Sequence, residues 1–361
     1  MNNSALRTPN SALIKVLLVD DSPIAITMLK RMLSLSPDIE VVGTACNGKE
    51  ALEMIPKLDP HVICADIHMP VMDGIKFTKE VMARHPMPIL VISVSVKKDK
   101  PSSNVFNMLA AGAIDISPKP HAGTDAEIQE SAVELARKVR ILSGVKIIRR
   151  VKPSTELKKE IHLAPSTAKG RLGDLKPKII VIGASTGGPV ALQEVLRKLP
   201  EDFSLPVVCV QHISEGFLNG LVEWLSSQCK MKVEIARTGE SPLTGTIYFP
   251  EEGRHLMFDK EGRFVSAEDM PYEGHRPSIT VTFRSAVCYY GNAVLGVLLT
   301  GMGRDGAEGM LAVKEAGGIT IAQDKETSIV FGMPKQAIDL GAAKYIASPD
   351  EIGEMLMQIR L

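Results

Sequence analysis

Short apolar runs alternate with amphipathic runs through the first 125 residues of this chain. Apolar runs of this length are typical of buried strands, and amphipathic runs such as 24–35 and 49–58 are typical of helices that pack on a sheet. Strands that alternate with helices form a doubly wound parallel sheet. We therefore predict an α/β domain whose five parallel strands lie at residues 15–19, 41–45, 62–65, 89–93 and 114–116.

A second α/β pattern begins near residue 178. It has apolar runs at 178–183, 207–211, 246–249, 294–299 and 318–322, and helical patterns at 191–199, 217–228, 307–316 and 334–340. Between the two patterns, residues 126–178 carry 13 basic and 6 acidic side chains, with a helical pattern at 126–142 followed by polar sequence that contains Pro and Gly. We predict a first domain at 13–130, a helix and basic flexible linker at 131–177, and a doubly wound domain with a mostly parallel sheet at 178–361.

Charge and cysteine content exclude several classes of protein. Lys plus Arg and Asp plus Glu both number 42, a balance that is untypical of nucleic-acid-coating proteins and of acidic disordered chains. The 5 cysteines form no CxxC pair, so neither a zinc knuckle nor a disulfide scaffold is indicated. No apolar run reaches the roughly 18 residues of a membrane helix, and we expect a cytoplasmic protein without membrane insertion.

Acidic side chains follow two strands of the first predicted sheet. Asp20 and Asp21 end the first strand, and Asp66 ends the third. Ligand sites form at the carboxyl ends of parallel strands, so these carboxylates should gather at one edge, where a divalent cation such as Mg²⁺ would offset their repulsion. Ser93 ends the fourth strand, and Lys119 follows the fifth. Together with the carboxylates they form a set of groups that can accept a phosphoryl group.

These residues carry a resemblance to response-regulator receiver domains, in the runs Val19-Asp20-Asp21-Ser22, 66–74 and Lys119-Pro120. The resemblance implies a flavodoxin-like fold, with Asp66 as phospho-acceptor and Mg²⁺ held by Asp20, Asp21, Asp66 and the carbonyl of His68. Ser93 and Lys119 would sense the phosphoryl group, and a sensor histidine kinase would be the phosphodonor. The family usually has an aromatic switch residue three positions before the lysine, where this chain has Ile116.

The second domain has a serine at a strand-to-helix turn. Ser185 lies in Gly183-Ala184-Ser185-Thr186-Gly187-Gly188-Pro189, directly after an apolar strand. Three interpretations compete: a phosphate-binding loop, a structural turn and a nucleophilic serine. The first lacks both GxGxxG spacing and a Gly-Lys-Ser/Thr ending. The third needs a base and an orienting carboxylate.

His212 and Asp305 are candidates for those two roles. His212 follows an apolar strand, and Asp305 lies in a glycine-rich loop after another, so both should lie at the same sheet edge as Ser185. Alone, His212 would be an ordinary loop histidine and Asp305 a helix N-cap. His255 and His275 are rivals, but neither follows a parallel-strand pattern. The order Ser, His, Asp argues against an α/β-hydrolase.

The runs 183–189, Gln211-His212, His275-Arg276-Pro277-Ser278, 299–306 and 323–334 resemble the catalytic domain of the chemotaxis protein-glutamate methylesterases, the CheB family. The resemblance implies Ser185 as nucleophile, His212 as base, Asp305 as orienting acid, and Thr186 and the Met302 backbone beside the oxyanion. It implies demethylation of glutamate γ-methyl esters on methyl-accepting chemoreceptors, with deamidation of receptor glutamine in some members. Hydrolysis would need no cofactor.

The two resemblances together imply a hydrolase regulated by phosphorylation. We expect a monomer in which the unphosphorylated receiver covers the Ser185 opening. The competing hypothesis is a response regulator with a non-catalytic output domain that binds a ligand, a nucleotide or nucleic acid. Against nucleic acid, residues 126–178 contain no aromatic side chain for base stacking, and residues 179–361 carry 16 basic and 23 acidic side chains.

Overall fold

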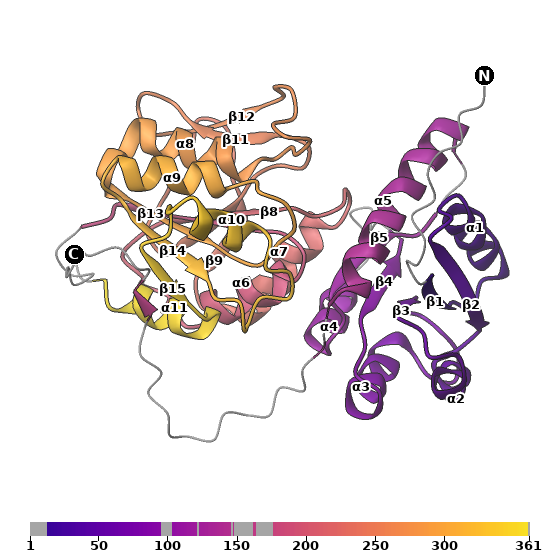
Figure 1. Ribbon diagram of the computed structural model, residues 1–361. Coiled ribbons are helices and arrows are strands. Elements are labelled where there is room, and N and C mark those ends of the chain that lie inside the picture. The colour runs from indigo at the N-terminus through magenta and orange to yellow at the C-terminus, as the bar shows by residue number, and fades with distance from the viewer. Residues whose placement is uncertain are drawn as a thin grey trace. The chain divides into compact units, whose positions relative to one another are not determined.

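The computed structural model describes residues 13–94, 103–120, 123–145, 147, 162–163 and 176–359. The chain divides into two compact units, each built around its own sheet (Figure 1). None of the helices in the described ranges is long and apolar enough to cross a membrane.

The first unit contains a five-stranded parallel sheet. Its strands are β1 (Ile14–Val19), β2 (Ile39–Ala45), β3 (Val62–Ala65), β4 (Ile89–Ser93) and β5 (Asp115–Pro118), and its helices are α1 (Pro23–Ser34), α2 (Gly48–Leu58), α3 (Gly74–Arg84) and α5 (Asp125–Ser143). Helix α4 (Ser103–Ala110) lies between β4 and β5 in the chain. The strand order is β2-β1-β3-β4-β5. Helices α1 and α5 pack together on one face, and α2 and α3 on the other (Figure 1). Because helices cover both faces, β3 and β4 are buried along their whole length.

The second unit contains an eight-stranded sheet and a separate hairpin. The sheet comprises β6 (His162–Leu163), β7 (Ile179–Ala184), β8 (Val207–Gln211), β9 (Lys232–Ile235), β10 (Thr246–Phe249), β13 (Val294–Leu298), β14 (Ile319–Gln323) and β15 (Tyr345–Ala347), and the hairpin comprises β11 (His255–Phe258) and β12 (Phe264–Ala267). The sheet order is β6-β15-β14-β13-β7-β8-β10-β9, and every pairing is parallel except β6 with β15. The central strands β7, β8 and β13 are fully buried.

Helices cover both faces of the second sheet. They are α6 (Gly188–Leu196), α7 (Leu218–Gln228), α8 (Ile279–Tyr290), α9 (Ala307–Glu315), α10 (Met333–Asp339) and α11 (Pro349–Met357). Helices α8 and α9 pack together on one face, and α6 and α11 on the other (Figure 1). The apolar side chains of β7, β8 and β13 join those of α8 and α9 in one core. This core fixes the strand ends that form the site.

The fold class predicted from the sequence is confirmed, and β3, β4, β8 and β10 have the predicted bounds. Strand β5 was predicted at 114–116 but extends to Pro118, because its pairing with β4 continues to that residue. Helix α6 begins three residues before its predicted start of 191, directly after the Ser185 turn. Strands β9 and β15 and helices α8 and α11 were not predicted from the sequence. His255 begins β11, which pairs with β12 in an antiparallel hairpin.

The predicted domain boundaries stay a prediction. Helix α5 continues to Ser143, so the predicted boundary at residue 130 lies within a helix. In the predicted linker, residues 162–163 form the edge strand β6. Its segments 148–161 and 164–175 lie outside the described residues.

Candidate active site

Ser185 and His212 follow two neighbouring strands. Strands β7 and β8 are paired in parallel with Ala184 opposite Gln211, and the His212 backbone N–H donates to the Ala184 carbonyl at 2.9 Å. Ser185 and His212 are the next residues on each strand. The parallel register therefore brings a hydroxyl and an imidazole to the same point of the sheet edge.

The Ser185 turn is held from two sides. The Ser185 N–H donates 3.0 Å to the Thr300 carbonyl, and the Gly188 N–H donates 2.7 Å to the Ser185 carbonyl as α6 begins. Gly187 has a φ of 77°, a conformation that suits glycine. A Cβ added at Gly301 would lie 2.7 Å from the Ser185 Cβ, so glycine is required where these two loops meet.

The two residues predicted beside an oxyanion flank this turn. Thr186 is buried, and its carbonyl accepts a 3.0 Å hydrogen bond from the Thr300 hydroxyl. Met302 follows Gly301 in the facing loop, and its side chain is partly exposed. Helix α6 begins two residues after Thr186, so its positive end lies at the Ser185 turn.

Asp305 is buried, with 1% of its surface exposed, and it accepts five hydrogen bonds. Oδ2 accepts from His212 Nε2 at 2.9 Å and from the Ile279 N–H at 2.8 Å. Oδ1 accepts from the Ser278 hydroxyl at 2.9 Å, the Thr280 N–H at 3.0 Å and the Gly306 N–H at 2.9 Å. Asp305 therefore lies at the N-terminus of α8, where backbone N–H groups and the helix dipole favour a negative charge.

These contacts determine the ionisation of Asp305. Burial would raise the pKa of its carboxyl, but hydrogen bonding and charge attraction from His212, together with hydrogen bonds from Thr280, hold the pKa well below its usual range. Asp305 is thus an anion at neutral pH. An ionised carboxylate only accepts hydrogen bonds, so Nε2 of His212 carries the proton that they share.

The other ring nitrogen of His212 has a different environment. Nδ1 is buried and has no hydrogen-bond partner among the described residues. In the neutral ring, a proton on Nε2 leaves a lone pair on Nδ1. The backbone around the ring is held by Gln211, whose Nε2 donates 2.8 Å to the Ser185 carbonyl and 2.7 Å to the His212 carbonyl.

Of the two rival histidines, one belongs to this site. His275 stacks on His212 with a ring-centroid distance of 4.1 Å and an interplanar angle of 10°. His255 is buried in β11, where its Nδ1 accepts a 3.1 Å hydrogen bond from the Ser278 N–H. His255 therefore orients the backbone that leads into α8.

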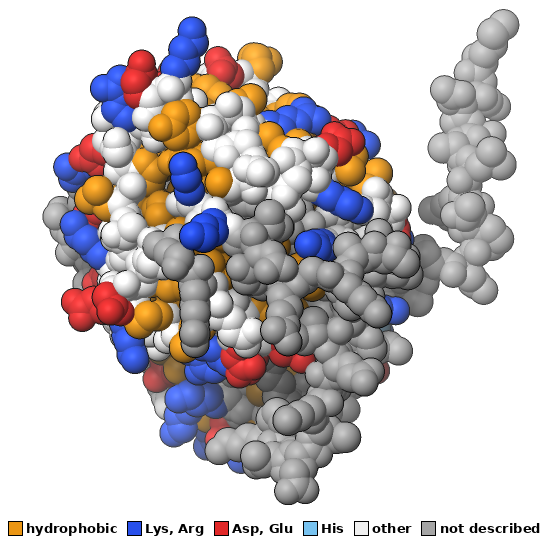
Figure 2. Space-filling model, turned by 90° about the vertical axis from the view of Figure 1, so that its left-hand side faces the viewer, with side chains coloured by type: hydrophobic (Ala, Val, Ile, Leu, Met, Phe, Trp, Pro, Cys, Tyr) orange, Lys and Arg blue, Asp and Glu red, His pale blue; other side chains and the backbone are white. Residues whose placement is uncertain are grey.

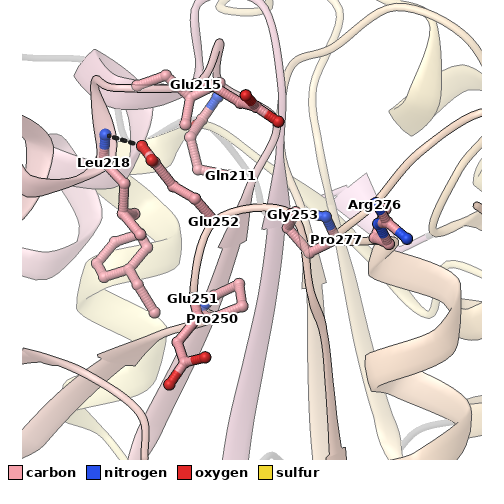
Figure 3. Close-up of a pocket in the computed structure, with 11 residues that line it drawn as sticks. Gln211, Glu215, Leu218, Pro250, Glu251, Glu252, Gly253, Arg276 and Pro277 are labelled. Carbon is pink, nitrogen blue, oxygen red and sulfur yellow. Dashed lines mark hydrogen bonds between the residues drawn. The ribbon is translucent and has the colours of Figure 1, made fainter. Parts of the chain in front are cut away.

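A pocket adjoins the site (Figure 3). It is lined by residues next to His212 and His275 in the chain and by three glutamates, among them Gln211, Arg276, Pro277, Glu215, Glu251 and Glu252. Figure 3 shows the Glu252 side chain directed toward the start of α7, where it accepts 2.9 Å hydrogen bonds from the N–H groups of Gly216 and Leu218. Glu252 therefore holds the loop that forms one wall of the pocket.

The carboxylates of the first unit gather as the sequence predicted. Strand β1 pairs with β3, and oxygen atoms of Asp20, Asp21 and Asp66 lie within 4.8 Å of one another. Asp20 and Asp66 are buried, and Asp21 is exposed. Three carboxylates at this spacing are hard oxygen ligands that fit Mg²⁺. His68 is exposed, and Ser93 is buried at the end of β4.

Lys119 bridges two of these carboxylates. Its Nζ lies 2.8 Å from Oδ2 of Asp20 and 2.9 Å from Oδ2 of Asp66. Burial would lower the pKa of Lys119, but its hydrogen bonds to both carboxylates outweigh burial and raise it. For Asp20, burial dominates and raises the pKa despite the Lys119 contact. Ile116 is buried in β5, and the Lys138 ammonium of α5 donates to its carbonyl.

Sequence reasoning missed several contributors to the candidate active site. It assigned no role to Gln211, to Ser278 or to the N–H groups that begin α8, and it set His275 aside. The run from His275 to Ser278 was part of the family resemblance, and this was the signal that could have drawn attention to it. Periodicity could not, because these residues precede a helix and follow no strand.

Comparisons with known proteins agree with this architecture. The CheB methylesterase family matches residues 180–356, and the response regulator receiver domain family matches residues 16–130. A protein-glutamate methylesterase/protein-glutamine glutaminase of Syntrophus aciditrophicus is 38% identical over 96% of this chain and 98% of its own length. One from Methanospirillum hungatei is 40% identical, with the same coverage of each chain.

Among solved structures, the CheB methylesterase catalytic domain of Thermotoga maritima is 38% identical, with a TM-score of 0.49, and covers 51% of this chain and 99% of its own. The full-length relatives share both halves with this protein. This chain therefore belongs to the CheB family of protein-glutamate methylesterases/protein-glutamine glutaminases that carry a response regulator receiver domain.

Proposed function

We propose that this protein hydrolyses glutamate γ-methyl esters on methyl-accepting chemoreceptors in the cytoplasm and deamidates receptor glutamine, under control of its receiver domain. The observation that carries the proposal is the hydrogen bond between His212 and Asp305, which leaves Nδ1 of His212 available at the strand end beside Ser185. Such clusters are recognised by geometry and roles.

In the first half of the reaction, Ser185 Oγ attacks the ester carbonyl and transfers its proton to His212 Nδ1. Asp305 stabilises the imidazolium that forms and holds the ring through Nε2. The ester C–O bond then breaks, and the methoxy oxygen takes the proton from Nδ1 and leaves as methanol. A glutamyl ester on Ser185 remains.

In the second half, water attacks the acyl carbon and transfers a proton to Nδ1. The bond to Ser185 Oγ breaks, Oγ takes the proton back, and the receptor glutamate is free. With glutamine as substrate, ammonia leaves in place of methanol. That leaving group must be protonated by the imidazolium, which makes deamidation the harder reaction.

The negative charge of the tetrahedral intermediate needs donors near Ser185. The backbone N–H groups of Thr186 and Met302 are the candidates, because their loops meet at this turn and α6 directs its positive end there. Donors placed in this way contribute about 3–4 kcal/mol each to lowering the barrier.

We infer that Asp66 accepts a phosphoryl group from a sensor histidine kinase. Asp20, Asp21, Asp66 and the His68 carbonyl would hold Mg²⁺, which neutralises phosphoryl oxygens. The Ser93 hydroxyl and the Lys119 ammonium would contact the phosphoryl group. The Lys119 contacts to Asp20 and Asp66 support this, because phosphorylation of Asp66 changes the charge that Lys119 faces.

The test is methanol release from methylated receptor by the full chain, with and without a small phosphodonor and Mg²⁺. Ser185→Ala should abolish turnover, and Asp66→Ala should retain the basal rate but lose stimulation. Ser226→Ala, which removes an exposed serine hydroxyl of α7, is the matched control and should behave as wild type. Normal turnover by Ser185→Ala would refute the proposed hydrolase site.

The competing output is a domain that binds nucleic acid or a nucleotide. On the face drawn in Figure 2, basic and acidic side chains of the described residues are intermingled, whereas a nucleic-acid surface gathers basic ones. A serine-directed phosphonate separates the remaining choices. Modification confined to Ser185 supports the hydrolase, and protection of Ser185 by a nucleotide supports the rival.

A further inference from the structure

His212 has contacts along one edge and one face of its ring. The edge contact is the hydrogen bond from Nε2 to Asp305, and the face contact is the His275 ring, stacked at 4.1 Å and nearly parallel. A single hydrogen bond fixes one atom of an imidazole but leaves the ring free to tilt about that atom. A flat neighbour at van der Waals distance removes this freedom, because a tilt would drive one ring into the other.

The chain presents His275 on a rigid turn. Tyr272 and His275 exchange backbone hydrogen bonds of 3.1 and 3.0 Å, and the two residues between them, Glu273 and Gly274, have φ values of 51° and 82°. A positive φ at both central residues is typical of a tight two-residue hairpin turn. The turn therefore has little freedom of its own.

Side chains attach this turn to helices of the same unit. The Tyr272 hydroxyl donates 2.8 Å to Glu308 of α9, which also forms a 2.7 Å ion pair with Arg284 of α8. Glu273 forms an ion pair with Arg304, the residue before Asp305. The turn that carries His275 is thus anchored to the same elements that hold Asp305.

We propose that His275 is a positioning residue for the reaction: its ring holds the plane of His212 so that Nε2 stays on Asp305 and Nδ1 keeps the orientation needed for the proposed proton transfer from Ser185. This rests on the proposed function of the site. His275 acts through the flat face of its ring, and proton transfer by its nitrogens is not required. The role belongs to the shape of the side chain, so a ring without nitrogens can replace it.

The experiment compares His275→Ala, His275→Phe and wild type in the full chain, by methanol release from methylated receptor with phosphodonor present. Both variants lose every hydrogen bond of the imidazole, but only phenylalanine keeps a flat ring. We expect kcat to fall about two- to tenfold in His275→Ala, the size of typical ring contacts, with KM unchanged, and to return to within about twofold of wild type in His275→Phe.

Glu261→Gln is the matched control for removal of a surface charge. It removes the exposed carboxylate that pairs with Arg263 between β11 and β12 but leaves the turn that carries His275 intact, and kcat should stay within about twofold of wild type, as expected for an exposed ion pair. If His275→Ala unfolds below the assay temperature, His275→Leu replaces it, because leucine fills the space without a flat face. Slow turnover by the leucine variant and fast turnover by the phenylalanine variant supports the proposal.

Two results would overturn the inference. Wild-type kcat in His275→Ala would show that the stacked ring is dispensable, and equal loss of kcat in His275→Ala and His275→Phe would show that the nitrogens matter. Ser185→Ala in the same assay separates this outcome from failure of the proposed function. If turnover is lost in Ser185→Ala but is unchanged in His275→Ala, only the positioning role is contradicted.

Discussion

Both units have a polar site at the carboxyl ends of parallel strands, but they compensate the negative charge of their buried carboxylates in different ways. The receiver gathers three carboxylates and offsets two of them with the Lys119 ammonium. The catalytic unit buries one carboxylate, Asp305, and surrounds it with five hydrogen-bond donors, most of them at the start of α8. Three of those donors are backbone N–H groups, two at the start of α8 and one, from Gly306, directly before α9, and they cannot leave the site without unfolding these helix ends.

This difference corresponds to two kinds of chemistry. A cluster balanced by a flexible lysine can exchange that cation for a metal ion or respond to a phosphoryl group, because its compensating charge is mobile. A carboxylate fixed by backbone donors keeps one geometry, which is what a proton-transfer site needs. The comparison can be tested by substitutions in each unit, at Asp305 and its donor Ser278 in the catalytic unit and at Lys119 in the receiver.

The largest effect is expected from Asp305→Asn, with a fall in kcat of about 10³–10⁴-fold. The amide presents a donor where Asp305 only accepts, so His212 loses the carboxylate that fixes its tautomer. Methanol release by the phosphorylated full chain measures this. A variant within tenfold of wild type would contradict the role of the anion.

The pH dependence of the unfolding free energy should also show that Asp305 is ionised in the folded protein. Because folding lowers the pKa of Asp305, its ionised form stabilises the fold above the ordinary aspartate pKa of about 4, and this contribution is lost as the pH falls below that value. The difference in unfolding free energy between wild type and Asp305→Asn should therefore shrink as the pH is lowered from about 5 to about 2.

The receiver should respond to Lys119→Ala by losing on the order of 2–3 kcal/mol of stability, because a buried carboxylate pair then lacks its cation. Millimolar Mg²⁺ should restore part of this loss. The readout is thiol labelling of Cys64 in β3, whose burial raises its pKa to about 12 and protects it in the folded unit. Cys209 of β8, also buried, is the internal control, and its rate should not change. No Mg²⁺ effect on Cys64 in the variant would contradict the exchangeable-cation interpretation.

The smallest expected effect distinguishes the two roles of Ser278, which caps α8 and donates a hydrogen bond to Asp305. Ser278→Ala and Ser348→Ala each remove the N-cap of a helix, at a cost of about 1 kcal/mol, but only Ser278 donates to Asp305. Both variants should lose similar stability by thermal unfolding, whereas kcat should fall several-fold only in Ser278→Ala. Equal kcat values would show that the hydroxyl does not support the carboxylate.

The sequence predicted the parts of both sites that follow from strands. Asp20, Asp66, Ser185 and His212 come directly after apolar runs, and parallel pairing brings the ends of such runs together. Apart from His212, the partners of Asp305 could not be found in this way. Three of them lie at the start of α8, a helix that was not predicted from the sequence, and two of these three are backbone N–H groups, which have no sequence signature.

By itself, the amino-acid sequence determined the two α/β patterns, the order of chemical groups at the strand ends and membership of the CheB family, because periodicity and motifs are local properties of the chain. The tertiary structure alone decided that His275 covers His212, that α8 supplies the donors to Asp305 and that Lys119 bridges Asp20 and Asp66. Those contacts join residues far apart in the chain, and they exist only when the packed sheets and helices fix the distances between them.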